Sequence, residues 1–110
     1  MNTRVHASPA LGGNYDLRAI ETLALDAASV ARVGLVRIGQ GVRSPAEGFR
    51  ASARHEIAYL VSGRVRVDTA DGTRIVEAGS VVVSSPTERH ATTALEDATL
   101  FYVLIDPPAG

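Results

Sequence analysis

The sequence contains no cysteine, which excludes disulfides, thiolate metal sites and a cysteine nucleophile. It also contains no lysine, so Schiff-base chemistry on a lysine side chain is excluded, and its 11 basic residues are all arginine. Because the net charge is −1, no basic field exists that would attract nucleic acid or an anionic membrane. Aromatic residues make up only 5% of the chain, which argues against stacking surfaces for sugars or nucleic acids.

Long apolar runs are also missing. No stretch approaches the roughly 18 unbroken apolar residues of a membrane span, and residues 1–20 lack the continuous apolar region of a signal peptide. We therefore expect a cytoplasmic protein. The length of 110 residues predicts one domain, able to bury about two thirds of its unfolded surface.

Short apolar segments separated by turn residues dominate the chain after residue 30. Gly63, Gly79 and Pro86 interrupt these segments, and Ala70-Asp71-Gly72 is typical of a hairpin turn. The pattern predicts an all-β antiparallel sandwich or barrel. The expected strands are 31–38, 55–61, 64–69, 73–76, 80–84, 90–95 and 98–105.

The two ends of the chain are predicted differently from this centre. Residues 1–30 form an N-terminal arm, within which residues 16–30 have no clean hydrophobic period and fit either a short helix or an extended edge structure. Residues 31–105 form the barrel. Residues 106–110, DPPAG, form a tail that cannot continue a strand.

Two motifs resemble those of the cupin superfamily. Glu56, followed after six residues by Gly63 and a hairpin, resembles the first cupin motif, and GSVVVSSPTERH, which ends at His90, resembles the second. The resemblance covers about residues 31 to 105. It implies a single small jelly-roll barrel, open at one end, with Glu56 and His90 lining the pocket.

Strand alternation supports an inward position for both residues independently. Side chains alternate between the two faces of a strand, so Glu56 shares its face with Ala58 and Leu60, and His90 shares its face with Thr92. A buried carboxylate requires a metal, a cation or hydrogen bonds, or it holds a proton. Alternatively, Glu56 forms an ion pair with a nearby arginine at the barrel rim and has no functional role.

The metal-ligand pattern of most metal-binding cupins is incomplete in this sequence. The resemblance implies two histidines spaced HxH before the acid. Counted back from Glu56, these positions hold Arg50 and Ser52; counted forward from Gly41, they hold Glu47 and Phe49, so the pair is absent in either register. His55 and Glu56 are neighbours and face opposite sides of a strand, so His55 is a poor substitute. Glu56 and His90, with Glu47 as a third candidate, are the metal ligands that the sequence offers. We expect no cofactor or a weakly bound divalent metal.

The residues that replace the histidines predict a different ligand. Arg50, Ser52 and Arg54 have the same parity as Glu56, and arginine binds carboxylates and phosphates through paired hydrogen bonds. A solvated arginine-rich loop is the alternative. We therefore assign Arg50, Ser52, Arg54 and Thr92 to substrate binding, with a carboxylate as the expected ligand.

Three functions remain open at this stage. The first is an acid–base enzyme (an isomerase, cyclase or lyase) in which Glu56, with a pKa raised by burial, and His90 act on a small organic acid without a tightly bound metal. The second is a metal-dependent cupin such as a dioxygenase, and the third is a non-catalytic module for ligand binding or sensing. We also expect a homodimer, in which the N-terminal arms could be exchanged, and no nucleic-acid or membrane partner.

Overall fold

The described residues of the computed structural model, 3–25 and 29–106, fold into strands and connecting segments without a helix. None of these residues therefore belongs to a helix long and apolar enough to cross a membrane. The strands are β1 (Tyr15–Ala24), β2 (Val30–Ile38), β3 (Arg43–Ser44), β4 (His55–Ser62), β5 (Arg64–Thr69), β6 (Gly72–Glu77), β7 (Val81–Ser84), β8 (His90–Ala94) and β9 (Ala98–Asp106).

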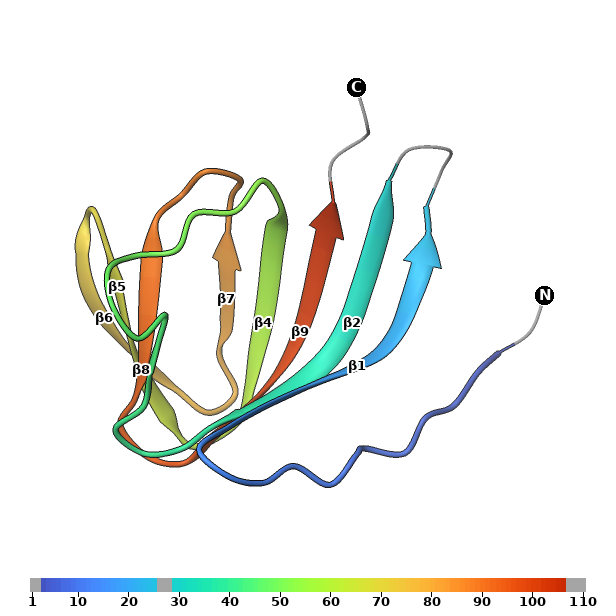
Figure 1. Ribbon diagram of the computed structural model, residues 1–110, viewed down its shortest axis with the longest axis horizontal. Coiled ribbons are helices and arrows are strands. Elements are labelled where there is room, and N and C mark those ends of the chain that lie inside the picture. The colour runs from blue at the N-terminus through green and yellow to red at the C-terminus, as the bar shows by residue number, and fades with distance from the viewer. Residues whose placement is uncertain (1–2, 26–28, 107–110) are drawn as a thin grey trace.

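Two antiparallel sheets face each other in a jelly-roll-like barrel (Figure 1). The five-stranded sheet has the order β1-β2-β9-β4-β7, and the four-stranded sheet has the order β3-β8-β5-β6. The connection between β3 and β4, drawn in green, crosses near the ends of both sheets (Figure 1). The prediction of an all-β barrel is confirmed.

The predicted strands are found with small changes at their ends, and two strands are added to them. Of the two alternatives for residues 16–30, the extended one is found over 15–24, because β1 pairs with β2 along its whole length. The helix alternative is wrong there, and residues 26–28 lie outside the described residues. The exchange of this segment between two copies stays a prediction. β9 includes Asp106, the first residue of the predicted tail, and residues 107–110 lie outside the described residues.

Alternation along β4 places its side chains as predicted. Leu60 is fully buried, and Ala58 faces the interior beside it, whereas Tyr59 and Val61 are exposed. The interior packs valine, leucine and alanine side chains from both sheets. The buried core consists of Val36, Ile38, Leu60, Val65, Val67, Ala94, Ala98, Leu100 and Tyr102.

Gly63 makes the sharp turn from β4 to β5. Its φ of +87° lies in the left-handed region, which other residues adopt at a cost. A Cβ built on Gly63 would lie 2.2 Å from the carbonyl oxygen of Asp97. The turn therefore requires glycine for two separate reasons.

Apolar side chains are also exposed on the outer face of the five-stranded sheet. Tyr59 lies between Val81 of β7 and Phe101 of β9, and Val83 pairs with Ile57 in the next row. All of these except Ile57 are well exposed. We call this group, Ile57, Tyr59, Val81, Val83 and Phe101, the outer patch.

Candidate functional site

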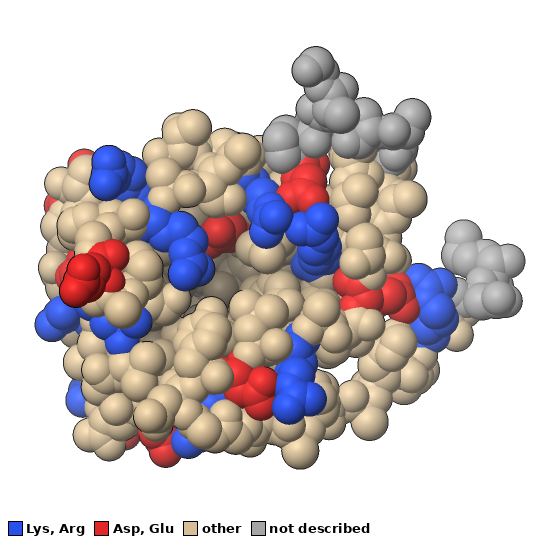
Figure 2. Space-filling model, in the orientation of Figure 1, with Lys and Arg blue, Asp and Glu red and all other residues tan. Residues whose placement is uncertain are grey.

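A cavity of about 770 Å³ lies between the two sheets and opens to solvent. Figure 2 shows a hollow on this face of the molecule, with basic side chains at its rim and an acidic side chain inside. Strands β1, β2, β4, β8 and β9 and the segment from residue 44 to 54 contribute its walls. Side chains from both sheets thus converge on one space.

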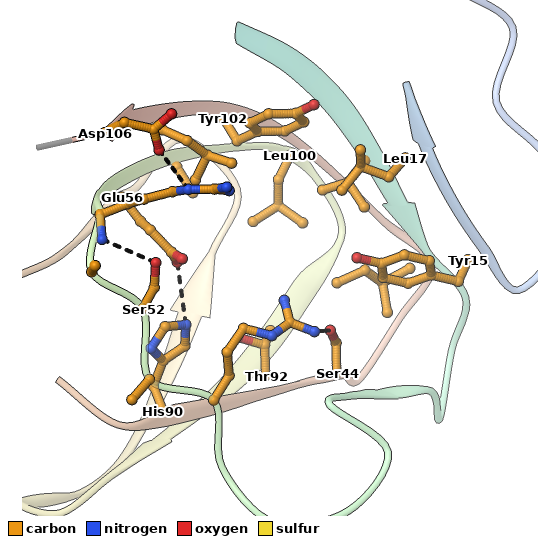
Figure 3. A pocket seen from close by; sticks show the side chains of 18 residues that line it. Tyr15, Leu17, Ser44, Ser52, Glu56, His90, Thr92, Leu100, Tyr102 and Asp106 are labelled. Atoms are coloured by element: carbon orange, nitrogen blue, oxygen red, sulfur yellow. Dashed lines mark hydrogen bonds and ion pairs between the residues drawn. The ribbon is translucent and has the colours of Figure 1, made fainter. Parts of the chain in front are cut away.

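Glu56 and His90 meet in this cavity from opposite sheets. Glu56 lies in β4, His90 is the first residue of β8, and Glu56 Oε2 is 3.4 Å from His90 Nε2 (Figure 3). Their side chains are 24% and 14% exposed, so water screens the pair only in part. The sequence prediction that both face one cavity agrees with this geometry.

Their contact shifts both pKa values toward the charged forms. The pKa of Glu56 lies below its usual value, mainly because of His90, although burial opposes the shift. The pKa of His90 is raised, mainly because of Glu56. The charged pair therefore stabilises the fold at intermediate pH. This stabilisation is lost as the pH falls through the lowered pKa of Glu56 or rises through the raised pKa of His90.

The expectation that burial raises the pKa of Glu56 is wrong. Burial does act in that direction, but the interactions with His90, Arg50 and Arg54 outweigh it. Glu56 is consequently a carboxylate near neutral pH and not a proton donor. In an acid–base pair with His90, Glu56 would therefore be the base.

The segment from 50 to 54 is fixed to the opposite sheet by backbone hydrogen bonds. The Arg50 N–H donates to the His90 carbonyl and the His90 N–H donates to the Arg50 carbonyl, each at 2.9 Å. The Thr87 N–H donates to the Ser52 carbonyl at 2.6 Å. β4 begins only at His55, so this segment is a loop at the cavity mouth and not a backward extension of β4.

Arg50 and Arg54 both line the cavity but have different partners. Arg54 Nε lies 2.6 Å from Asp106 Oδ1, and Arg32 Nη2 lies 3.2 Å from Asp106 Oδ2. Arg50 makes a long hydrogen bond of 3.3 Å to Ser44 Oγ and no ion pair with any residue of 3–25 or 29–106. Arg50 is therefore the arginine whose charge remains available to a ligand.

The remaining predicted binding residues, Ser52 and Thr92, also line the cavity. Ser52 Oγ accepts a hydrogen bond of 3.0 Å from the Arg54 N–H (Figure 3), so its hydroxyl hydrogen stays available for donation. Thr92 pairs with Ser44 of β3. These hydroxyl groups add neutral donors beside the charged residues.

The donor set does not fit a tightly bound metal ion. Glu47, the third candidate ligand, is exposed and lies outside the cavity lining, so the structure does not bring it together with Glu56 and His90. Its loop precedes the segment that is fixed to β8. Within the described part of the chain, no group of three or more histidine, aspartate or glutamate side chains could hold a metal. Two ligands next to arginine charges are fewer than zinc or iron sites normally have.

The other two histidines lie away from the cavity lining. His55 is exposed at the start of β4, as alternation predicts. His6 Nε2 lies 2.8 Å from Glu21 Oε1 of β1. Neither belongs to the site.

Several residues of the cavity are not among those predicted from the sequence. Tyr15 and Leu17 come from β1, and Tyr102 and Asp106 come from β9 (Figure 3). The shared parity of Leu100, Tyr102, Leu104 and Asp106 is the signal that could have found the β9 residues. Both faces of that strand are apolar, so alternation could not choose the inner one.

Comparisons with known proteins agree with this fold. No family model matches the chain, and no curated protein matches it in sequence. A cupin superfamily protein from Desulfitobacterium hafniense aligns over 90% of this chain and 84% of its own, with a TM-score of 0.70 and 11% identity. The cupin domain of Cnp3 from Schizosaccharomyces pombe aligns over 91% and 70%, with a TM-score of 0.70 and 13% identity.

An enzyme has the same architecture. Ectoine synthase from P. lautus aligns over 91% of this chain and 69% of its own, with a TM-score of 0.68 and 14% identity. Identities this low establish the fold and no more. The protein therefore has a cupin fold, a fold that enzymes and other domains share.

Proposed function

We propose that the protein binds an organic acid in the barrel cavity and transfers a proton at a carbon beside a carbonyl group of that acid. One observation carries the proposal: the Glu56–His90 pair and the unpaired guanidinium of Arg50 line the same cavity. The pair supplies a base next to a positive charge. The arginine supplies an anchor for a carboxylate.

The charge balance of the cavity favours an anionic ligand. Asp106 is already bound by Arg54 and Arg32, and Glu56 is paired with His90. Among the described residues Arg50 has no ion pair of its own, although its charge also acts on Glu56, so the cavity keeps an excess of positive charge. A carboxylate would neutralise it.

In the proposed reaction the Glu56 carboxylate removes a proton from the carbon beside the carbonyl group. The electron pair of the broken C–H bond moves to the carbonyl oxygen, which becomes an enolate. Protonated His90 and Arg50 stabilise this negative charge. Return of the proton to the same or another carbon completes an exchange or an isomerisation, and Glu56 becomes a carboxylate again.

Substitution of Arg50 tests the anchor. We expect Arg50→Ala to weaken the binding of 2-oxo acids by about ten- to a hundredfold, because a charged hydrogen-bonded pair contributes about 1.5–3 kcal/mol. Isothermal titration calorimetry in the presence of EDTA measures the change. Arg64→Ala is the matched control, since Arg64 is an exposed arginine of β5 outside the cavity lining. Equal affinities in Arg50→Ala and the wild type would show that Arg50 is only a solvated loop residue.

We also propose a homodimer that uses the outer patch. Patches of exposed apolar side chains on soluble proteins often mark interfaces, and Tyr59, Val81 and Phe101 are neighbours across three strands. We expect Val83→Arg to convert the dimer to a monomer, because it places a charge in the apolar contact. Light scattering at micromolar concentration measures the mass. A monomeric wild-type protein would refute the proposal.

A further inference from the structure

The cavity has two chemically different ends. Glu56, His90 and Arg50 gather at the mouth, beside Leu104, which pairs with Glu56 across β4 and β9. Farther along β9 from this end, the wall is formed by a row across three neighbouring strands. Leu17 of β1 pairs with Val36 of β2, and Val36 pairs with Leu100 of β9.

The apolar row is separated from the charged end along β9. Leu100 precedes Leu104 by four residues on β9, which corresponds to about 13 Å along the strand. Tyr15 and Ile38 form a second apolar pair beside the row. A carboxylate held at Arg50 could therefore place an apolar body along this wall.

Exposed apolar surface marks the part of the wall that is not yet covered. Leu17 is 48% exposed and Tyr15 is 45% exposed, although both line the cavity (Figure 3). The cavity volume of about 770 Å³ also greatly exceeds the needs of a carboxylate group alone. It falls in the range of roughly 300–1,000 Å³ that holds drug-sized organic ligands.

Gly34 helps to keep this wall open. A Cβ at Gly34 would lie 2.3 Å from the hydroxyl oxygen of Tyr102, its pairing partner on β9. The absence of a side chain lets the Tyr102 ring lie against the sheet. The ring then forms part of the wall and leaves the adjoining space to a ligand.

We propose that the ligand is an amphiphilic organic acid, with its carboxylate at Arg50 and an aliphatic body against Leu17, Val36 and Leu100. This assignment rests on the proposed function, since it takes the carboxylate anchor from it. It adds a specificity that the charged residues alone do not provide. Small polar acids such as acetate would leave the wall exposed.

A homologous series of ligands tests the assignment. Calorimetric titration with acetate, butyrate, hexanoate and octanoate below their micellar concentrations should show affinity rising with chain length, by about two- to fourfold for each methylene group that reaches the wall. In Leu17→Asn the rise should become clearly shallower while acetate binding is unchanged. Leu25→Asn is the matched control, because Leu25 is similarly exposed, at 54%, but lies outside the cavity lining. Thermal melts confirm that both variants fold.

The outcomes separate this inference from the function on which it rests. If octanoate binds no tighter than acetate, or if Leu17→Asn and Leu25→Asn behave alike, the apolar wall does not select the ligand and the inference fails. The carboxylate anchor would survive that result. If octanol binds as tightly as octanoate, the anchor is wrong, and the proposed function falls together with the inference.

Discussion

Glu56→Gln should lower the rate of proton exchange in a bound 2-oxo acid by about 10²–10⁴-fold, the usual contribution of a positioned general base. Glutamine keeps the size of the side chain but cannot accept the proton. Binding should be retained or strengthened, because the substitution removes a negative charge next to an anionic ligand. Loss of the C3 proton signal of 2-oxohexanoate in D₂O, followed by NMR, measures the exchange rate.

Two controls make this result interpretable. Buffer alone gives the spontaneous rate, and Glu77→Gln, an exposed carboxylate of β6, gives the effect of removing a charge elsewhere. Equal rates in Glu56→Gln and the wild type would exclude Glu56 as the base. If the wild-type protein binds 2-oxo acids without any exchange above buffer, the protein is a binding module for them and proton transfer is refuted.

Gly63→Ala should be the most destabilising of the single substitutions considered, by about 2–5 kcal/mol. A left-handed backbone conformation costs alanine about 1 kcal/mol or more. The new methyl group must also displace the carbonyl of Asp97, and overpacking of this kind costs about 1–3 kcal/mol. Urea unfolding measures the change in the free energy of unfolding.

Gly41 provides the matched control for this prediction. Its φ of +82° is close to that of Gly63, but a Cβ there would meet no atom within 4 Å. Gly41→Ala should therefore cost only the backbone strain, about 1 kcal/mol. If the two alanine variants are equally stable, displacement of the Asp97 carbonyl adds no cost to the backbone strain at Gly63.

The fold could be predicted from the sequence because its strands are marked at both ends. Glycines and prolines separate the segments, and the alternation of side chains in β4 and β5 identifies the inner faces. The sequence of β1 shows no such clear alternation. Tyr15–Ala24 mixes alanine and leucine, and its extended form depends on pairing with β2, which is a tertiary interaction.

The candidate site could be predicted only for residues whose positions follow from the alternation of side chains along a strand. Alternation placed Glu56 and His90 toward the interior, and both line the cavity. The position of Arg50 depends on a loop that leaves the strand pattern, and the backbone bonds to His90 fix it there. Glu47 lies in the same loop, and no pattern in the sequence could show that it faces solvent.

The ionisation of Glu56 was predicted wrongly for a related reason. Sequence reasoning could weigh burial, since the strand is apolar, but it could not weigh partners that come from other elements. His90 and Arg50 reach Glu56 only after the two sheets close. The sign of a pKa shift depends on this balance, so it follows from the tertiary structure alone.

The paired backbone bonds between Arg50 and His90 have a consequence for the thermodynamics of ligand capture. Ordering one residue of a free loop costs about 1–2 kcal/mol of conformational entropy. In this protein the entropy of the loop at the cavity mouth is lost during folding, because the backbones of Arg50 and Ser52 are already hydrogen-bonded to His90 and Thr87. A guest molecule then encounters a receptor already in its binding conformation, so its affinity reflects the contacts it makes and is not reduced by loop ordering.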